Sequence, residues 1–188
     1  MIKRLLATIL ALSTCMVLHT AQAGTQVEVK TTVGNFVVEL NDEKAPKTTE
    51  NFLKYVNSGF YKDTIFHRVI NGFMIQGGGF TKDMQQKPTG SPIPIESNNG
   101  LKNAAYTIAM ARTADPNSAT AQFFINVVDN PNLDYPRPDG YGYAVFGAVT
   151  QGKDTIDTIK RVTTGRHSYY SDVPLNPIVI KEINVIKP

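Results

Sequence analysis

The stretch Phe66–Gly78, FHRVINGFMIQGG, constrains the fold of this chain more than any other. Two runs rich in β-branched and apolar residues flank Asn71-Gly72, a dipeptide that predicts a β-hairpin turn. Because side chains alternate between the two faces of a strand, Arg68 is expected to share a face with Phe66 and Ile70. Placing a charged side chain on an apolar strand face costs free energy unless another group interacts with it. The pattern therefore indicates that Arg68 has a functional role.

Three further residues lie close to this arginine in the sequence: Phe73, Met74 and Gln76. With Arg68 they predict an apolar pocket that holds one cation and one amide. Such a pocket suits a neutral, partly apolar ligand whose electron density has to be polarised. Strand alternation turns His67 to the opposite face, which favours a structural or solvated histidine over an acid–base role.

Most other periodic segments are short and alternate as strands do. Gly34-Asn35 is a second hairpin-turn signal. One amphipathic helix is predicted from near Pro46, whose fixed φ suits a first turn, to near Ser58-Gly59, and another from about Gly152 to Val162. Strands are predicted at 27–32, 36–40, 64–70, 73–76, 105–110, 123–127, 144–149 and 178–185.

Eight antiparallel strands and two helices predict a mainly β fold, a closed eight-stranded antiparallel β-barrel capped by two α-helices. Side chains fill a barrel of this size, so a ligand site is expected on its outer surface or rim. The loops at 88–99 and 129–140 are long, and long loops within a compact domain are often functional.

The first 23 residues have the features of a secretory signal peptide. Lys3-Arg4 is a positive start, an apolar run of about 14 residues follows, and Ala21-Gln22-Ala23 is a cleavage site before Gly24. The run is shorter than the roughly 20 residues that span a bilayer. We expect 1–23 to be removed on export and 24–188 to form one domain with no membrane segment. A retained anchor and lipidation at Cys15 are the less favoured alternatives.

The composition argues against several classes of function. Of the 188 residues, 41% are hydrophobic and 19% are charged, as in ordinary globular proteins. Loss of Lys3 and Arg4 would lower the net charge from +3 to about +1, and the sequence has no basic stripe, so nucleic-acid binding has little support. Cys15 is the only cysteine, so the cleaved chain would have no thiol chemistry and no cysteine-based zinc site.

The sequence also lacks other catalytic motifs. His67 and His167 have no metal-ligand spacing, so no metal is expected. No G-x-S-x-G turn is present for a serine hydrolase. The glycines at 77–79 are not followed by Gly-Lys-Ser/Thr, so a phosphate loop is not supported. We expect these glycines to let the backbone pass close to the barrel or to a substrate.

Three blocks of the sequence resemble the cyclophilins, which are peptidyl-prolyl cis-trans isomerases. They are FHRVINGFMIQGGGF at 66–80, MAR at 110–112 together with 118–127, and YAVFG at 143–147. The resemblance spans about Thr25 to Ile186 and is strongest to bacterial periplasmic A-type members. It implies the same barrel with two helices and an isomerase that needs no metal or cofactor. It also implies a periplasmic location and a role in folding exported proteins.

The resemblance further implies which residues act. The catalytic residues would be Arg68, Phe73 and Gln76. The substrate-binding residues would be Met74, Ala111, Arg112, Gln122, Phe124, Leu133 and Tyr143. Of these, the apolar residues at 73, 74, 124 and 133 would hold the proline ring, and the backbone at 111–112 would pair with the substrate peptide.

At three positions the chain departs from the family pattern. Asn132 stands where many eukaryotic members have a tryptophan that helps to bind cyclosporin, so weak cyclosporin binding is expected. Arg112 replaces an asparagine that acts through its backbone, and Tyr143 replaces a histidine. The implied partners are unfolded or extended proline-containing polypeptides, and the default state is a monomer. The alternative function is a non-catalytic module or holdase that binds extended peptides in the same groove.

Overall fold

The computed structural model describes residues 24–187, so the predicted signal peptide at 1–23 lies outside the described residues. Two α-helices, α1 (Pro46–Asn57) and α2 (Lys153–Ile159), and a short 3-10 helix at Pro131–Leu133 interrupt a series of strands. The strands are β1 (Gln26–Thr31), β2 (Gly34–Leu40), β3 (Thr64–Ile70), β4 (Met74–Thr81), β5 (Thr107–Met110), β6 (Phe123–Asn126), β7 (Val145–Gln151), β8 (Thr164–His167), β9 (Tyr170–Pro174) and β10 (Val179–Lys187).

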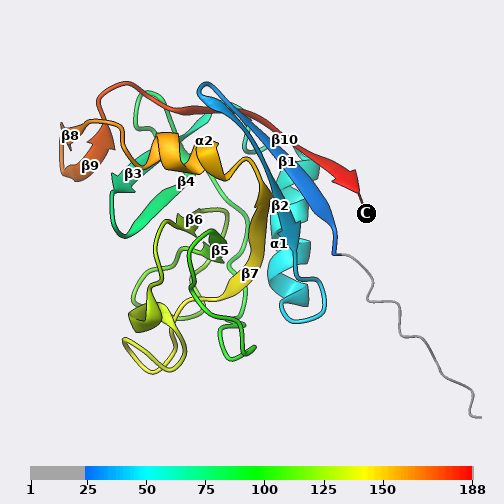
Figure 1. Ribbon diagram of the computed structural model, residues 1–188. Helices are drawn as coiled ribbons and strands as arrows, with labels where there is room; N and C mark the ends of the chain where they lie inside the picture. Colours follow the sequence, from blue (N-terminus) through cyan, green and yellow to red (C-terminus); the bar gives the residue numbers. More distant parts are fainter. Residues whose placement is uncertain (1–23, 188) are drawn as a thin grey trace, which may run out of the picture.

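Eight of the described strands form a closed barrel in the order β1-β10-β3-β4-β6-β5-β7-β2, with antiparallel neighbours throughout. The predicted fold class, an eight-stranded antiparallel barrel with two helices, is confirmed. The remaining strands, β8 and β9, pair with each other and form a separate hairpin. Figure 1 shows this hairpin at the edge of the molecule beside β3.

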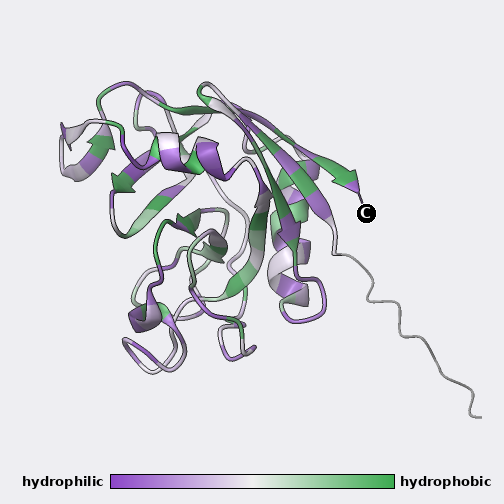
Figure 2. Ribbon diagram, viewed as in Figure 1, coloured by the Kyte–Doolittle hydropathy of each residue, from purple (hydrophilic) through white to green (hydrophobic). Residues whose placement is uncertain are grey.

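Alternation along the strands fills the barrel with apolar side chains. In β1, for example, Val27 and Val29 are fully buried, whereas Glu28 and Lys30 are partly exposed. Figure 2 shows hydrophobic and hydrophilic residues mixed along the strands. The interior cluster also contains Phe36, Phe66, Phe123 and Phe146, each with at most 1% of its surface exposed. Because the interior is filled, a ligand site has to lie on the outer surface.

Both helices contribute to this same interior cluster. Phe52 of α1 lies edge-on to Phe123, with ring centroids 5.8 Å apart, and α2 buries Ile156 and Ile159. Helix α1 has the predicted bounds. Helix α2 is shorter than predicted because its last turn tightens, since Val162 N–H donates to the Ile159 carbonyl three residues back.

The first hairpin turn lies two residues before the predicted position. Thr31 pairs with Gly34, so the chain turns at Thr32-Val33 and not at Gly34-Asn35. Gly34 has a φ of +139°, and a Cβ there would lie 2.6 Å from the Thr155 hydroxyl of α2. The glycine therefore provides room for α2 and does not form the turn.

The β8–β9 hairpin was absent from the sequence prediction. Its first strand, Thr164–His167, has no buried residue, and a strand without a buried face shows no hydrophobic alternation. The register shifts between Gly165 and His167, which interrupts the period further. A strand of this kind is recognised only from its hydrogen-bonded partner.

No helix within residues 24–187 is both long and apolar enough to cross a membrane.

One contact generates a prediction about stability. Helix α1 has no capping side chain of its own, and the carboxylate of Glu96 instead accepts hydrogen bonds from the N–H groups of Lys47 (3.1 Å) and Thr48 (2.8 Å). The Thr48 hydroxyl also donates to this carboxylate, at 2.6 Å. We expect Glu96→Ala to lower the free energy of unfolding by about 1–2 kcal/mol, measured by urea denaturation.

Glu50→Ala is the matched control, because this carboxylate lies on the same helix and pairs with Lys54 in an exposed contact. It should change the stability by at most about 0.5 kcal/mol. Equal losses in the two variants would show that Glu96 does not act as the cap.

Candidate active site

The outer face of the hairpin formed by β3 and β4 brings Arg68 beside Gln76. Ile70 pairs with Met74, so the loop is Asn71-Gly72-Phe73, and Gly72 has a φ of +81°. The predicted hairpin turn is thus confirmed. Arg68 pairs with Gln76, Gln76 pairs with Phe124 on β6, and Phe124 pairs with Ala109 on β5. Neighbouring residues in register share a face, so this row crosses four strands of the barrel surface.

A β-bulge in β3 decides which side chains face outward. Phe66 and Val69 both belong to the interior cluster although they are three residues apart. The register shifts between Phe66 and Arg68, which leaves two consecutive residues, His67 and Arg68, on the outside. Arg68 therefore shares a face with Ile70, as predicted, but not with Phe66. The prediction that His67 faces away from Arg68 is wrong for the same reason.

Apolar side chains gather on this outer face in a cluster separate from the barrel interior, called here the outer cluster. Met74 is 2% exposed and Phe124 is 4% exposed, so both lie at its base. The Tyr143 ring meets Phe124 edge-on, with centroids 5.6 Å apart. The cluster consists of Met74, Ala109, Phe124 and Val145, with Ile70, Phe73, Leu101, Ala111, Leu133 and Tyr143 partly buried against them. All six apolar residues assigned to substrate binding or to the proline pocket are thus in one place.

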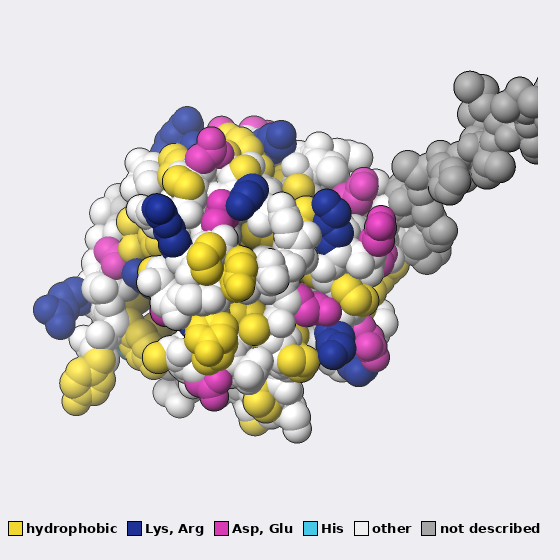
Figure 3. All heavy atoms as spheres, turned by 90° about the horizontal axis from the view of Figure 1, so that it is seen from below, with side chains coloured by type: hydrophobic (Ala, Val, Ile, Leu, Met, Phe, Trp, Pro, Cys, Tyr) yellow, Lys and Arg dark blue, Asp and Glu magenta, His cyan; other side chains and the backbone are white. Residues whose placement is uncertain are grey.

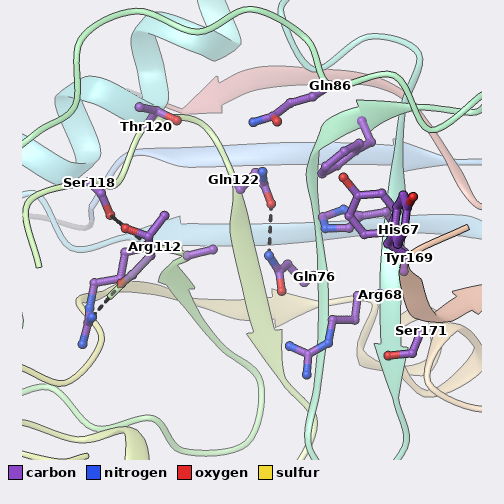
Figure 4. A pocket seen from close by; sticks show the side chains of 14 residues that line it. His67, Arg68, Gln76, Gln86, Arg112, Ser118, Thr120, Gln122, Tyr169 and Ser171 are labelled. Carbon is purple, nitrogen blue, oxygen red and sulfur yellow. Dashed lines mark hydrogen bonds between the residues drawn. The ribbon is translucent and has the colours of Figure 1, made fainter. Parts of the chain in front are cut away.

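A cavity of about 460 Å³ lies next to this cluster and contains the polar residues of the predicted site. Arg68, Gln76, Ala111, Arg112 and Gln122 line it. Figure 4 shows Arg112 at one end of the cavity and Arg68 toward the other, with the two glutamines between them. Ala111 belongs to both the cavity and the outer cluster, so the two surfaces are continuous.

The two glutamines hold each other in place. The Gln76 amide nitrogen donates to the Gln122 side-chain oxygen at 3.0 Å, a contact drawn in Figure 4. A Cβ at Gly79 would lie 2.4 Å from Gln122 Cγ, so only glycine leaves room for this side chain. The glycines at 77–79 thus allow close approach to the barrel wall, as the sequence suggested. Gln122 therefore lines the cavity beside Gln76.

The side chain of Arg112 is occupied by contacts within the protein and stabilises a loop. Its guanidinium donates two hydrogen bonds to the Asp139 carboxylate, at 2.7 and 2.9 Å, and further bonds to the Gly142 carbonyl. It also lies over the Tyr143 ring at 4.5 Å. The hydrogen bond from Arg112 lowers the pKa of Asp139 below its usual value. Asp139 was not predicted, because a lone acidic residue in a loop carries no periodic signal.

Arg68 differs from Arg112 in having no such partner. None of the ion pairs or side-chain hydrogen bonds within residues 24–187 includes its guanidinium, although the side chain is partly buried in the cavity wall. The main-chain N–H and C=O of Arg112 are also free of main-chain hydrogen bonds in the described range. The site therefore offers one cation with unused donors and one free peptide edge, an arrangement that suits an extended polypeptide.

Three asparagines behind the outer cluster were missed by sequence analysis. The Asn130 amide donates to the Phe73 carbonyl (2.8 Å) and to the Asn126 side chain (2.7 Å). The Asn126 amide in turn donates to the Asn103 side chain (3.2 Å). These contacts tie the loop that carries Leu133 to the β3–β4 turn. Their positions in the sequence are far apart, so only the fold reveals that they act together.

His67 is buried at the edge of the cavity. Its ring lies 4.5 Å from the Phe80 ring, and its Nδ1 atom is buried without a partner within the described residues. Burial, together with the neighbouring charge of Arg68, lowers the pKa of His67 from 6.5 to about 4. The imidazole is therefore neutral near pH 7, which agrees with a structural role and not with acid–base chemistry.

Within residues 24–187 no group of three or more His, Cys, Asp or Glu side chains is placed to hold a metal ion.

Comparisons with known proteins agree on one family. Residues 26–185 match the family model described as cyclophilin type peptidyl-prolyl cis-trans isomerase/CLD. The chain is 60% identical to peptidyl-prolyl cis-trans isomerase cyp18 of Streptomyces antibioticus over 162 residues, 85% of this chain and 98% of the relative. It is 50% identical to peptidyl-prolyl cis-trans isomerase A of Dickeya dadantii over 190 residues, with all of both chains covered.

A solved structure is similar as well. The cyclophilin type peptidyl-prolyl cis-trans isomerase of Cryptosporidium parvum, crystallised in the presence of the dipeptide Ala-Pro, matches with a TM-score of 0.72 and 30% identity. The match covers 87% of this chain and 99% of that chain. The likeness thus extends over most of this chain.

The buried His67 generates a prediction about pH. A neutral histidine with a lowered pKa contributes stability that is complete above about pH 6.5 and is lost as the pH falls toward 4, because the unfolded chain takes up the proton first. The full effect is about 3 kcal/mol. We expect His67→Phe, which keeps a ring against Phe80, to lose about 3 kcal/mol less stability than the wild type between about pH 7.5 and pH 4, measured by urea denaturation.

His167→Phe is the matched control, because it removes the histidine of the exposed β8–β9 hairpin. If the wild type and His67→Phe lost stability in parallel as the pH fell, the buried-histidine account would be wrong.

Proposed function

This chain belongs to the family of cyclophilin-type peptidyl-prolyl cis-trans isomerases, and on that premise we propose that it rotates X-Pro bonds in exported, unfolded polypeptides and so assists their folding. The isomerase activity follows from the family. The exported clients and the residue roles are our proposal. The observation that carries it is the Arg68 guanidinium, which lies beside the outer cluster and has no ion-pair or hydrogen-bond partner among residues 24–187.

The reaction to be catalysed is slow rotation about the X-Pro peptide bond. Resonance gives the X-Pro C–N bond partial double-bond character, with a barrier of about 18–20 kcal/mol, so uncatalysed exchange takes tens to hundreds of seconds. Rotation breaks this conjugation, and in the twisted state the prolyl nitrogen regains a lone pair. A donor aimed at that nitrogen stabilises the twisted state more than either planar state, which is the requirement for catalysis.

Arg68 is the group placed to be this donor. Its guanidinium keeps its charge at any working pH and presents rigidly oriented N–H groups. Arg112, the other arginine of the cavity, cannot serve, because Asp139 and the Gly142 carbonyl already occupy its donors. We therefore assign Arg68 as the catalytic residue, with Gln76 beside it, oriented by Gln122.

The outer cluster supplies the anchor for the proline ring. Phe73 and Leu133 are partly exposed above the buried Met74 and Phe124, so a ring that settles there is surrounded by apolar surface. Exclusion of water at this point also lowers the local dielectric and strengthens the contact with Arg68. The free main-chain edge at Arg112 would hold the peptide in an extended conformation.

The contribution of one charged donor can be compared with the reduction of the barrier that catalysis requires. A hundred-thousand-fold acceleration corresponds to about 7 kcal/mol. One charged donor in a dry site contributes about 3–4 kcal/mol, by analogy with oxyanion donors. Desolvation of the bound bond and conformational strain on the anchored peptide would have to supply the remainder. No nucleophile or proton transfer is needed for this reaction.

The test is an isomerisation assay on a proline peptide that compares the wild type with Arg68→Ala. We expect the substitution to lower kcat/KM by at least about a hundredfold, because the donor to the twisted state is lost. Arg68→Lys should recover only part of the activity, since it keeps the charge but not the fork of donors. Arg161→Ala, an exposed arginine after α2, is the matched control and should retain full activity.

Full activity in Arg68→Ala would show that the assigned mechanism is wrong. A wild type that binds the peptide but exchanges it no faster than buffer would replace the proposal with the alternative, a non-catalytic module or holdase.

We also propose that the protein is exported and resides in the periplasm. The positive start, the apolar run and the Ala21-Gln22-Ala23 site support this. Cleavage after Ala23 would leave every barrel strand intact, because β1 begins at Gln26. Mass spectrometry of the exported protein should give a chain that begins at Gly24, and a full-length or lipid-modified chain would contradict the proposal.

Two further expectations stay predictions. Asn132 lies exposed in the 3-10 helix before Leu133, and we expect weak cyclosporin binding because asparagine offers no indole ring. A monomer remains the expected state in solution.

A further inference from the structure

The β8–β9 hairpin carries two tyrosines at the edge of the cavity that holds Arg68. Tyr169 is 96% exposed and Tyr170 is 40% exposed, yet both line this cavity together with Ser171. Figure 3 shows the hairpin projecting at the left edge of the molecule, with hydrophobic and basic side chains exposed on it. Tyr169 buries almost none of its surface in the described fold, so fold stability does not account for an aromatic residue there.

A row of rings supports the base of the hairpin. The Tyr170 ring meets Phe80 edge-on at 5.3 Å, and Phe80 lies 4.5 Å from the His67 ring. Phe80 is 5% exposed, so this row is anchored in the barrel surface. Tyr170 therefore has a partner within the fold, and Tyr169, at the turn, is left with its ring in solvent.

The wall of the cavity near the tyrosines also contains an unsatisfied polar atom. His67 is only 5% exposed, and its Nδ1 atom is buried without a hydrogen-bond partner in the described residues. The rings of His67 and Phe80 both line the cavity, so they add flat ring surface to the wall next to the tyrosines. Figure 4 shows His67, Tyr169 and Ser171 at the end of the cavity opposite to Arg112 and Ser118.

Two residues of the β8–β9 hairpin have a left-handed backbone conformation. Ser168 and Asp172, which bracket the two tyrosines and Ser171, have φ values of +54° and +61°. Left-handed conformations are uncommon for residues other than glycine and persist where the surroundings require them. These two left-handed residues shape the hairpin so that Tyr169 stands in the solvent next to the cavity.

The charges at this end of the cavity restrict what can bind. Arg68 lies in the cavity wall and Arg166 is exposed on β8. Asp172 is the acidic residue of the hairpin, and its carboxylate accepts a hydrogen bond from the Ser171 hydroxyl at 3.1 Å. His67 is neutral near pH 7. The two cations disfavour a lysine or arginine side chain at this end of the cavity by charge repulsion. The exposed rings suit an aromatic side chain, which can stack on them.

We propose that Tyr169 and Tyr170 form a subsite that binds an aromatic side chain of the substrate polypeptide, close to the proline and on the side of the groove away from Arg112. The subsite rests on the proposed isomerase function and continues the same groove, since one cavity contains Arg68 and both tyrosines. It makes the enzyme selective for the sequence around the proline, through stacking of rings.

The experiment compares three peptides by exchange NMR, a method that sets no requirement on the residues around the proline. One peptide has alanines on both sides of the proline, one has a phenylalanine two positions after it, and one has a phenylalanine two positions before it. We expect the wild type to have a higher kcat/KM for one of the phenylalanine peptides than for the alanine peptide. The peptide that shows this preference reports the direction of the chain in the groove.

The variants then assign the preference to the ring. In Tyr169→Ala the ratio of kcat/KM between the preferred and the alanine peptide should fall about three- to tenfold, and Tyr169→Phe should restore it. Tyr169 is so exposed that its removal leaves the core intact. Leu175→Ala is the matched control, because Leu175 is 64% exposed just after β9 and does not line the cavity.

The outcomes separate the two proposals. Isomerisation of all three peptides at equal rates, or a ratio that Tyr169→Ala leaves unchanged, would overturn the subsite and leave the isomerase function standing. A wild type that isomerises none of the peptides would overturn the proposed function and, with it, the subsite.

Discussion

The site depends on one irregularity, the bulge in β3 between Phe66 and Arg68. With regular alternation after Phe66, Arg68 would point into a barrel interior that is already filled with apolar side chains, where a charge without a partner is strongly disfavoured. The extra residue places Arg68 on the outer surface and returns Val69 to the core. Bulges are common beside active sites because they redirect one side chain without disturbing the rest of the strand.

The loops that surround Arg68 are held in place by hydrogen bonds in which Arg68 takes no part. Asn130 holds the Phe73 carbonyl, and Arg112 holds the loop through Asp139 and Gly142. Each of these contacts joins segments that are far apart in the sequence. They position the apolar rings of the outer cluster while leaving the Arg68 donors unused. The division between one arginine that stabilises a loop and one that remains available is a property of the whole surface, not of either residue type.

Much of this arrangement could be predicted from the sequence. The strands of the barrel were recognised because a period of two is visible in short segments, and α1 was recognised from Pro46 and a following apolar stripe. The motif residues at 68, 73, 74, 76 and 124 do meet on one outer face. Gly34 was misread as a turn residue because its actual neighbour, Thr155, is more than a hundred residues away. The hairpin β8–β9 was missed because its strands lack a continuous buried face.

The sequence alone determined the fold class, the presence of an arginine among apolar residues at a hairpin, and the residue types of the outer cluster. These follow from local properties, namely alternation, turn residues and short motifs. Only the tertiary structure decided that His67 lies on the outer surface of the barrel together with Arg68. It also decided that Asp139 forms an ion pair with Arg112 and that Tyr169 lies at the edge of the same cavity. The physical reason is that the face of a bulged strand, the partner of a charge and the docking of a hairpin are set by long-range contacts, which no local pattern encodes.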